Sequence, residues 1–153
     1  MSYVDRVLQP GERVLARATL HWVIYLNGLF ALLAAAVVAV AASRAQGFED
    51  AVRFIALLLA AVGAVLLVRA WYHRWGMEIA VTNRRVIYKT GIVRRRTVEM
   101  NVEQIESVEV KQSILGRILG YGSIGLHGTG AGTEIIPRVA DPLTLRNAVT
   151  ARE

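Results

Sequence analysis

Cysteine is absent from this chain of 153 residues, and proline occurs only three times. Without thiols the protein cannot form a disulfide, build a thiolate zinc site or use a cysteine nucleophile. Acidic residues are also scarce: 12 stand against 18 basic residues, which leaves a formal net charge of +6. A basic surface of this kind favours nucleic acid or anionic lipid as a partner, and the position of the hydrophobic residues decides between the two.

Hydrophobic residues make up 54% of the chain, and their excess lies between residues 22 and 71. No charged residue occurs from Trp22 to Ala42, a stretch that rises about 30 Å as a helix and matches a bilayer core. A second apolar run follows at about 52–71, where the stems of Arg53 and Arg69 can extend to the interface. We therefore expect a two-helix transmembrane hairpin within residues 21–75, with membrane lipids rather than nucleic acid as the partner.

Two other interpretations of these apolar runs are weaker. A buried helical hairpin in a soluble protein would need a larger core than the remaining residues can supply. A cleaved signal peptide is suggested by the small residues at 39–41, but the first run is too long for a signal core and a second run follows at once.

The distribution of arginine predicts the orientation of the hairpin. Arginine occurs before the first run at positions 6, 13 and 17 and at or after the end of the second at positions 69, 74, 84 and 85, whereas the loop region between them has only Arg44 and Arg53. The positive-inside rule then places both termini in the cytoplasm of a bacterial cell, with a multi-pass protein in its inner membrane. Aromatic residues at the same ends are expected to be membrane-interface anchors: Trp22, Tyr25, Trp71, Tyr72 and Trp75.

Outside the hairpin, the sequence alternates as β-strands do. Residues 12–20, within the N-terminal segment 1–20, place Val14, Ala16, Ala18 and Leu20 on one face, with Leu15 as the exception. In the domain at 76–153 we predict six more strands, at 77–82, 85–89, 92–100, 105–112, 121–127 and 133–137. A final helix is expected after Asp141 as its cap, with Leu143, Leu145 and Val149 facing the core.

Seven strands closed by one C-terminal helix are typical of a pleckstrin-homology (PH) barrel, here with the hairpin inserted after the first strand. An ordered series of segments also resembles the membrane-anchored bacterial PH-like domains (the DUF304 or bPH2 family): residues 81–87, Gly91, 102–108, 111–122, 136–137 and 141–142. The resemblance implies this fold and membrane anchoring. It implies no defined biochemical activity.

A basic cluster is the main candidate for a contact with lipid or an acidic partner. If residues 92–100 form a strand, Arg94 and Arg96 share one face. Arg84, Arg85 and Lys89 are near in sequence and would enlarge the patch. The alternative is a solvated strand edge whose charges prevent aggregation.

Residues 113–121 predict a short amphipathic helical turn between two strands. Ile114, Leu115, Ile118 and Leu119 have helical spacing, with Gly116 and Gly120 between them. These side chains are expected either to form a lid over the core or to contact another subunit or the membrane.

No segment of the sequence predicts a catalytic, cofactor or metal site. The glycine-rich residues 128–132 lack the Gly-Lys-Ser/Thr ending and the following helix of a phosphate loop. His21, His73 and His127 are scattered, and the glutamates at 99, 103, 106 and 109 are spaced like a solvated surface. We expect a non-enzymatic binding or scaffolding module that acts through protein assembly, as a homo-oligomer or with an integral-membrane protein partner. The second hypothesis is an accessory subunit of a larger integral-membrane complex, because small residues in both runs favour close helix contacts. A membrane-embedded enzyme is the weakest of the three.

Overall fold

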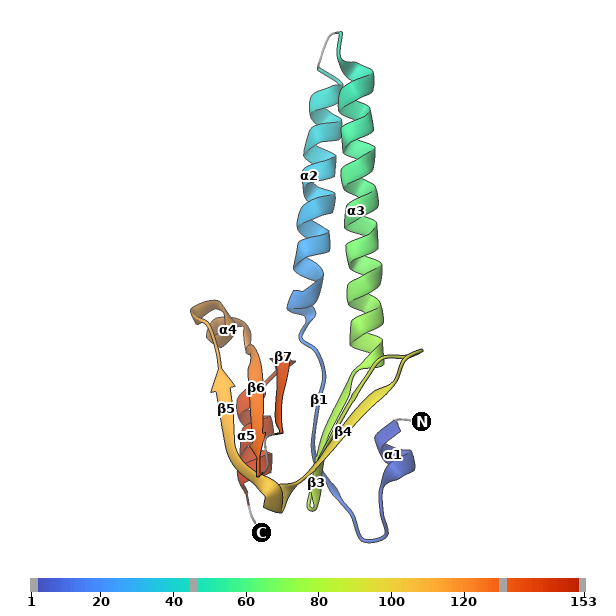
Figure 1. Ribbon diagram of the computed structural model, residues 1–153. Coiled ribbons are helices and arrows are strands. Elements are labelled where there is room, and N and C mark those ends of the chain that lie inside the picture. Colours follow the sequence, from blue (N-terminus) through green and yellow to red (C-terminus); the bar gives the residue numbers. More distant parts are fainter. Residues whose placement is uncertain (1–2, 45–46, 130–131, 152–153) are drawn as a thin grey trace. The chain divides into compact units, whose positions relative to one another are not determined.

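The computed structural model describes residues 3–44, 47–129 and 132–151 (Figure 1). These residues form two compact units, one of them Trp22–Tyr72 and the other made of the segments on either side of it. The chain leaves the larger unit after His21 and enters it again at His73. Residues that flank the hairpin therefore belong to one domain.

The smaller unit is a helical hairpin. A short 3-10 turn, η1 (Trp22–Tyr25), leads into α2 (Leu26–Ala42), and α3 (Glu49–Gly76) runs back beside it. Both helices are long and apolar enough to cross a bilayer, judged by length and composition. Only 17% and 11% of their most apolar windows are buried, so most of their hydrophobic surface is not covered by this chain.

Small residues separated by seven positions line the contact between the two helices. The buried residues of this series are Gly28, Ala35 and Ala42 in α2, and Ala56, Gly63 and Ala70 in α3. A Cβ atom at Gly28 would lie 2.7 Å from the side chain of Leu67, and one at Gly63 would lie 2.9 Å from that of Leu32. Small residues let helix backbones approach closely, and a seven-residue period winds helices around each other with a left-handed twist. Ala35 and Gly63 thus serve the hairpin itself.

The described residues of the larger unit form seven strands in two antiparallel sheets, which confirms the predicted number of strands. The four-stranded sheet has the order β1 (Val14–Ala18), β2 (Glu78–Thr82), β3 (Arg85–Thr90) and β4 (Arg96–Asn101). The three-stranded sheet has the order β5 (Ile105–Lys111), β6 (Tyr121–Gly128) and β7 (Thr133–Ala140). The turn η2 (Val102–Gln104) connects the sheets.

Strand β1 precedes the hairpin and pairs with β2, which follows it, so that Ala18 lies opposite Ile79. Its alternation is as expected, with Ala18 and Leu20 buried and Leu15 exposed. Beyond β1, the His21 N–H donates to the carbonyl of Arg138, and the Ala140 N–H donates to the carbonyl of Thr19. The same segment thus joins the edge of one sheet to the edge of the other.

A short N-terminal helix, α1 (Tyr3–Val7), was not predicted and covers the outer face of the four-stranded sheet. Val4 is buried against Ala80 and Ile87. The Glu78 carboxylate accepts hydrogen bonds from the N–H groups of Tyr3 and Val4, which holds the start of the helix. Because α1 covers one face and the core covers the other, four successive residues of β2 are buried.

Two predictions about the later elements need correction. The strand expected at 92–100 begins only at Arg96, because Gly91 has a φ of +82° and turns the chain into a loop. The last helix, α5 (Pro142–Thr150), is capped by Asp141, which accepts from the Thr144 N–H as predicted. Its inward residues are Leu145 and Val149, whereas Leu143 is exposed.

Candidate functional site

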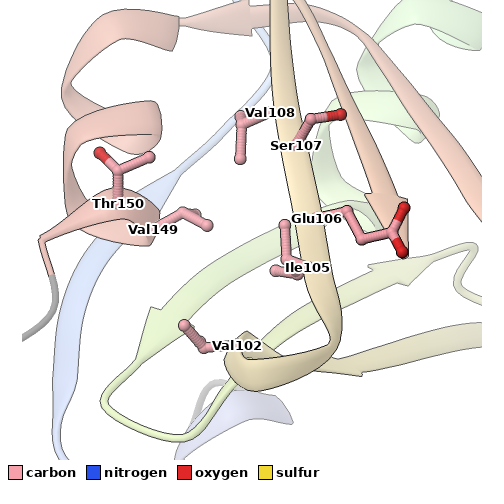
Figure 2. Close-up of a pocket in the computed structure, with 7 residues that line it drawn as sticks. All are labelled: Val102, Ile105, Glu106, Ser107, Val108, Val149 and Thr150. Atoms are coloured by element: carbon pink, nitrogen blue, oxygen red, sulfur yellow. The ribbon is translucent and has the colours of Figure 1, made fainter. Parts of the chain in front are cut away.

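A groove of about 300 Å³ lies between strand β5 and helix α5 (Figure 2). Val102, Ile105 and Val108 line it from the η2–β5 segment, and Val149 and Thr150 line it from the helix. Figure 2 shows Val108 and Val149 pointing toward each other across this space. The valines make the floor apolar, whereas Figure 2 shows the Glu106 side chain pointing to the side of β5 that faces away from Val149 and Thr150.

The strand that borders this groove is the outer strand of its sheet. In the described part of the chain, β5 pairs with β6 on one side and has no strand partner on the other. An edge strand presents unpaired backbone N–H and C=O groups, which can pair with an extended segment of another chain. A groove beside such an edge suits the side chains of that segment.

The structure divides the predicted basic patch. Arg84 and Arg85 lie at the β2–β3 turn, whereas Arg94 lies beyond the other end of β3. Lys89 is only 9% exposed and lies 5.3 Å from the centre of the Tyr3 ring, so α1 shields it. The burial of Lys89 depends on α1, a helix that the sequence patterns do not predict.

The remaining basic residues also separate. Arg85 is largely buried in an internal ion pair, and Arg96 lies 3.3 Å from Glu134, although most of its side chain is exposed. Arg94 and Arg95 are exposed in the loop before β4 and do not share a strand face with Arg96. The five residues therefore form no single surface.

The amphipathic segment between β5 and β6 is helix α4 (Ile114–Leu119). Ser113 caps its start by accepting from the Gly116 N–H, and Gly120 ends it in the left-handed conformation. Gly116 is buried against the backbone of Tyr121, which turns the other residues outward. Ile114, Leu115 and Ile118 are 80%, 64% and 75% exposed. They are therefore no lid over the core, and Leu119 is the least exposed of the four.

The predicted aromatic anchors lie at one end of the hairpin. Trp22 and Tyr25 are in η1, and Trp71 and Tyr72 are near the end of α3. Gly28 and Leu67 approach each other, which brings these two chain segments to the same end. Trp75 follows one turn later on α3 and is 70% exposed.

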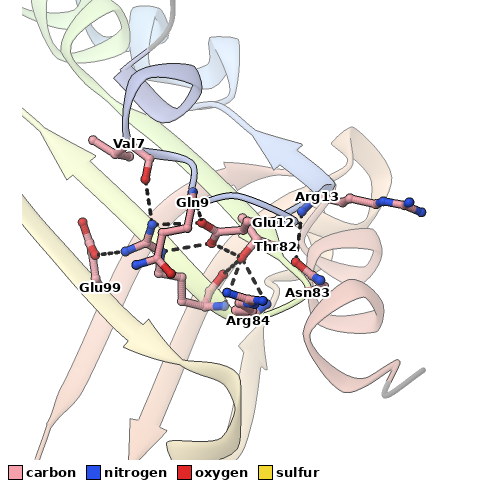
Figure 3. A network of polar contacts seen from close by, with 9 residues as sticks. Val7, Gln9, Glu12, Arg13, Thr82, Asn83, Arg84 and Glu99 are labelled. Atoms are coloured by element: carbon pink, nitrogen blue, oxygen red, sulfur yellow. Dashed lines mark hydrogen bonds and ion pairs between the residues drawn. The ribbon is translucent and has the colours of Figure 1, made fainter.

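A buried ion pair ties the N-terminal segment to the strands that follow the hairpin (Figure 3). Arg85 donates through Nε and Nη2 to the Glu12 carboxylate, at 3.0 and 2.9 Å. It also donates to the carbonyl of Val7 and to Glu99. The Thr82 hydroxyl donates to Glu12 at 2.7 Å. No spacing in the sequence points to this network, because Glu12 and Arg85 are 73 positions apart.

The surroundings of Glu12 change its acidity. Burial by itself would raise the pKa of Glu12, but hydrogen bonds from Arg85, the Gln9 N–H and Thr82 outweigh that effect. The pKa of Glu12 is therefore lowered from 4.5 to about 2. The same hydrogen bond to Glu12 raises the pKa of Arg85. Both groups are fully charged at neutral pH, and each stabilises the other.

Other titratable residues do not converge on one point. Across residues 3–44, 47–129 and 132–151, no group of three histidine, aspartate or glutamate side chains is placed to hold a metal ion. The ring of His21 stacks on that of Tyr121, with centroids 5.2 Å apart, while His127 contacts Thr133. Part of the glycine-rich turn at 128–132 lies outside the described residues.

Comparison with known proteins gives one match. The model of a family described as "Bacterial PH domain" matches residues 18–152, which is most of the chain and includes the hairpin. No curated protein and no solved structure matches.

The ion pair predicts a pH-dependent contribution to stability. Removing one partner of a buried ion pair typically lowers the free energy of unfolding by about 3–5 kcal/mol. Because Arg85 keeps its contact with Glu99, we expect a smaller loss of about 2–3 kcal/mol for Glu12→Gln at pH 7. The depressed pKa means that this stability is complete above pH 4.5 and is lost as the pH falls toward 2. Denaturant unfolding in detergent should show that the difference in the free energy of unfolding between wild type and variant becomes smaller below pH 4.5. A matched Glu103→Gln change, at an exposed position of η2, should have no effect, and a gap that is constant with pH would contradict the assignment.

Proposed function

The chain belongs to the bacterial PH domain family, and on this premise we propose that it is a membrane-anchored module that binds protein segments at the cytoplasmic leaflet of the bacterial inner membrane. Its hairpin is the anchor, and the groove beside β5 is the binding site. PH-like domains are generally non-catalytic binding modules, which supports binding rather than catalysis as the role of this one.

Exposed apolar surface supports the membrane anchor. Leu33 and Val37 of α2, and Leu57 and Val65 of α3, are all more than 60% exposed. Large contiguous apolar surfaces are rare on soluble monomers and are normal for helices that face lipid. Burying this surface in a bilayer also keeps β1 and β2 beside the membrane, because the hairpin is inserted between them.

The charges beside the two spans support a cytoplasmic domain. Arg13 and Arg17 precede the first helix, and Arg74, Arg84 and Arg85 follow the second. Such residues are retained on the cytoplasmic side of bacterial membranes. Both termini and the β-domain then lie on the cytoplasmic side of the membrane.

Orientation can be measured with a reporter fused after Glu153. Alkaline phosphatase is active only in the periplasm, and green fluorescent protein delivered unfolded across the membrane fluoresces only in the cytoplasm. We expect the fluorescent fusion to be bright and the phosphatase fusion to be inactive, both in the membrane fraction. An active phosphatase fusion would show the opposite orientation, and a soluble fluorescent fusion would contradict the anchor.

The groove beside β5 is the observation that supports binding of a protein segment. An extended segment added to β5 would gain backbone hydrogen bonds from the strand and would place alternate side chains toward Val102, Val108 and Val149. That segment comes from a second copy in a scaffold, or from a foreign subunit if the protein is an accessory component. Ala35 and Gly63 lie at the contact between α2 and α3. These small residues therefore give less support to helix contacts with a foreign subunit.

Site-specific photo-crosslinking in intact cells tests this binding site. A photoreactive residue at Thr150, an exposed residue of α5 that lines the groove, should give one defined adduct whose crosslinked peptide is an extended segment. The same residue at Ile135 of β7, which is 60% exposed, is the control and should not give that adduct. Val108→Trp should fill the groove and abolish the Thr150 adduct without lowering the melting temperature. Equal adducts from both positions, or an adduct that survives the filled groove, would contradict the proposal.

A further inference from the structure

Helix α4 and the loop at 91–95 lie at the same end of the β-domain. Strand pairing places the end of β1, the start of β2 and the β3–β4 loop together, because Ala18 lies opposite Ile79, Glu78 opposite Lys89 and Thr90 opposite Arg96. In the second sheet, Lys111 and Ser123 are paired next to α4, and Leu20 bridges to Val139. The bridge from Leu20 joins the two sheets at this end.

This end is also where the chain departs for the hairpin. His21, the last residue before the first apolar helix, stacks on Tyr121 and forms a hydrogen bond with the backbone of Leu119. Gly76, the last residue of α3, packs so closely against Gly91 and Ile92 that an added Cβ atom would lie 3.2 Å from each. Helix α4 and the loop each contact a residue that borders the hairpin.

The surface at this end is apolar and basic. Helix α4 presents Ile114, Leu115 and Ile118, with Arg117 exposed between them. The loop presents Val93, which is 87% exposed, and the side chains of Arg94 and Arg95. Neither segment contains an acidic residue. Apolar side chains that enter the interfacial region and arginines that meet anionic headgroups are the two components of a membrane-binding surface.

Both segments are held in defined conformations. The carbonyl of Gly120 accepts from the Asp141 N–H, which fixes the end of α4 to the last helix. At Gly91, a Cβ atom would lie 2.0 Å from the carbonyl oxygen of Arg94, so only glycine permits this closed loop. The exposed hydrophobic residues therefore belong to segments with defined backbone conformations.

We propose that α4 and the 91–95 loop form a membrane-docking face, which seats the domain on the anionic leaflet from which its own spans emerge. This inference rests on the proposed membrane anchor and adds a second contact with the same bilayer. Docking would fix the tilt of the domain and hence the direction in which the β5 groove faces.

The absence of cysteine makes the proposal directly measurable. In the full-length protein, single Ile118→Cys, Glu103→Cys and Leu33→Cys variants are each labelled with an environment-sensitive fluorophore. They are reconstituted in vesicles of phosphatidylcholine and phosphatidylglycerol that carry a quencher near the headgroups or along the acyl chains. Glu103, in η2, is the matched exposed control at the opposite end of the domain, and Leu33, on α2, reports on the span.

We expect acyl-chain quenching at Leu33, headgroup-region quenching at Ile118 and none at Glu103. Quenching at Leu33 with equal, weak signals at Ile118 and Glu103 would overturn the docking face and leave the anchor intact. No quenching at Leu33 would overturn the anchor and the docking face with it. A label at Ile118 that is shielded from lipid quencher and from aqueous iodide alike would show that a protein covers α4, which also overturns docking.

The arginines give a second readout. Each cation near an anionic surface contributes about fivefold to the ratio of docked to undocked domain, so Arg94→Gln and Arg95→Gln should each lower that ratio about fivefold. Their effect should disappear in vesicles of phosphatidylcholine alone, where no anionic charge is present. Arg84→Gln, at the opposite end of β3, is the control and should change nothing. An equal effect of Arg94→Gln in both lipids would contradict charge-assisted docking.

Discussion

The buried pair between Glu12 and Arg85 is the constraint on which the rest of the structure depends. It joins a residue that precedes the hairpin to one that follows it, with 13% of the Arg85 side chain and none of the Glu12 side chain exposed. Leaving either charge without its partner in this position is costly. The pair therefore favours one arrangement, in which β1 lies beside β2, α1 covers the outer sheet face, and both ends of the hairpin leave from the same end of the domain.

This arrangement also determines how the hairpin is connected to the β-domain. The chain enters and leaves the hairpin through β1 and β2, which are paired neighbours. The seven-residue series of small residues keeps α2 and α3 in close contact, as Gly28 and Gly63 show. Most of their apolar surface is left uncovered by the described residues. In the proposed function, the exposed groups of α4 add a second contact between the domain and the membrane.

Much of the fold was predictable from local patterns, because alternation of apolar residues and turn residues act over short distances. Strand β1 and the Asp141 cap followed from such patterns. The burial of Lys89 did not, since it depends on α1, whose Glu78 contacts span more than seventy positions. The loop position of Arg94 is likewise outside the reach of strand alternation, because it follows from the left-handed conformation of Gly91. The groove between β5 and α5, and the Glu12–Arg85 pair, exist only through tertiary contacts that no spacing in the sequence reveals.

The most direct test of a domain assembled from both sides of the hairpin is to remove the hairpin. Because Ala18 and Ile79 are paired neighbours, a short glycine–serine linker can replace residues 22–72 without disturbing β1 or β2. The thermal unfolding of this hairpin-free chain should be compared with that of residues 73–153 alone. If both segments form one domain, the hairpin-free chain is soluble and unfolds in a single cooperative transition. Residues 73–153 alone, which lack β1 and Glu12, are then unfolded or aggregated. Equal cooperative transitions for both would contradict it.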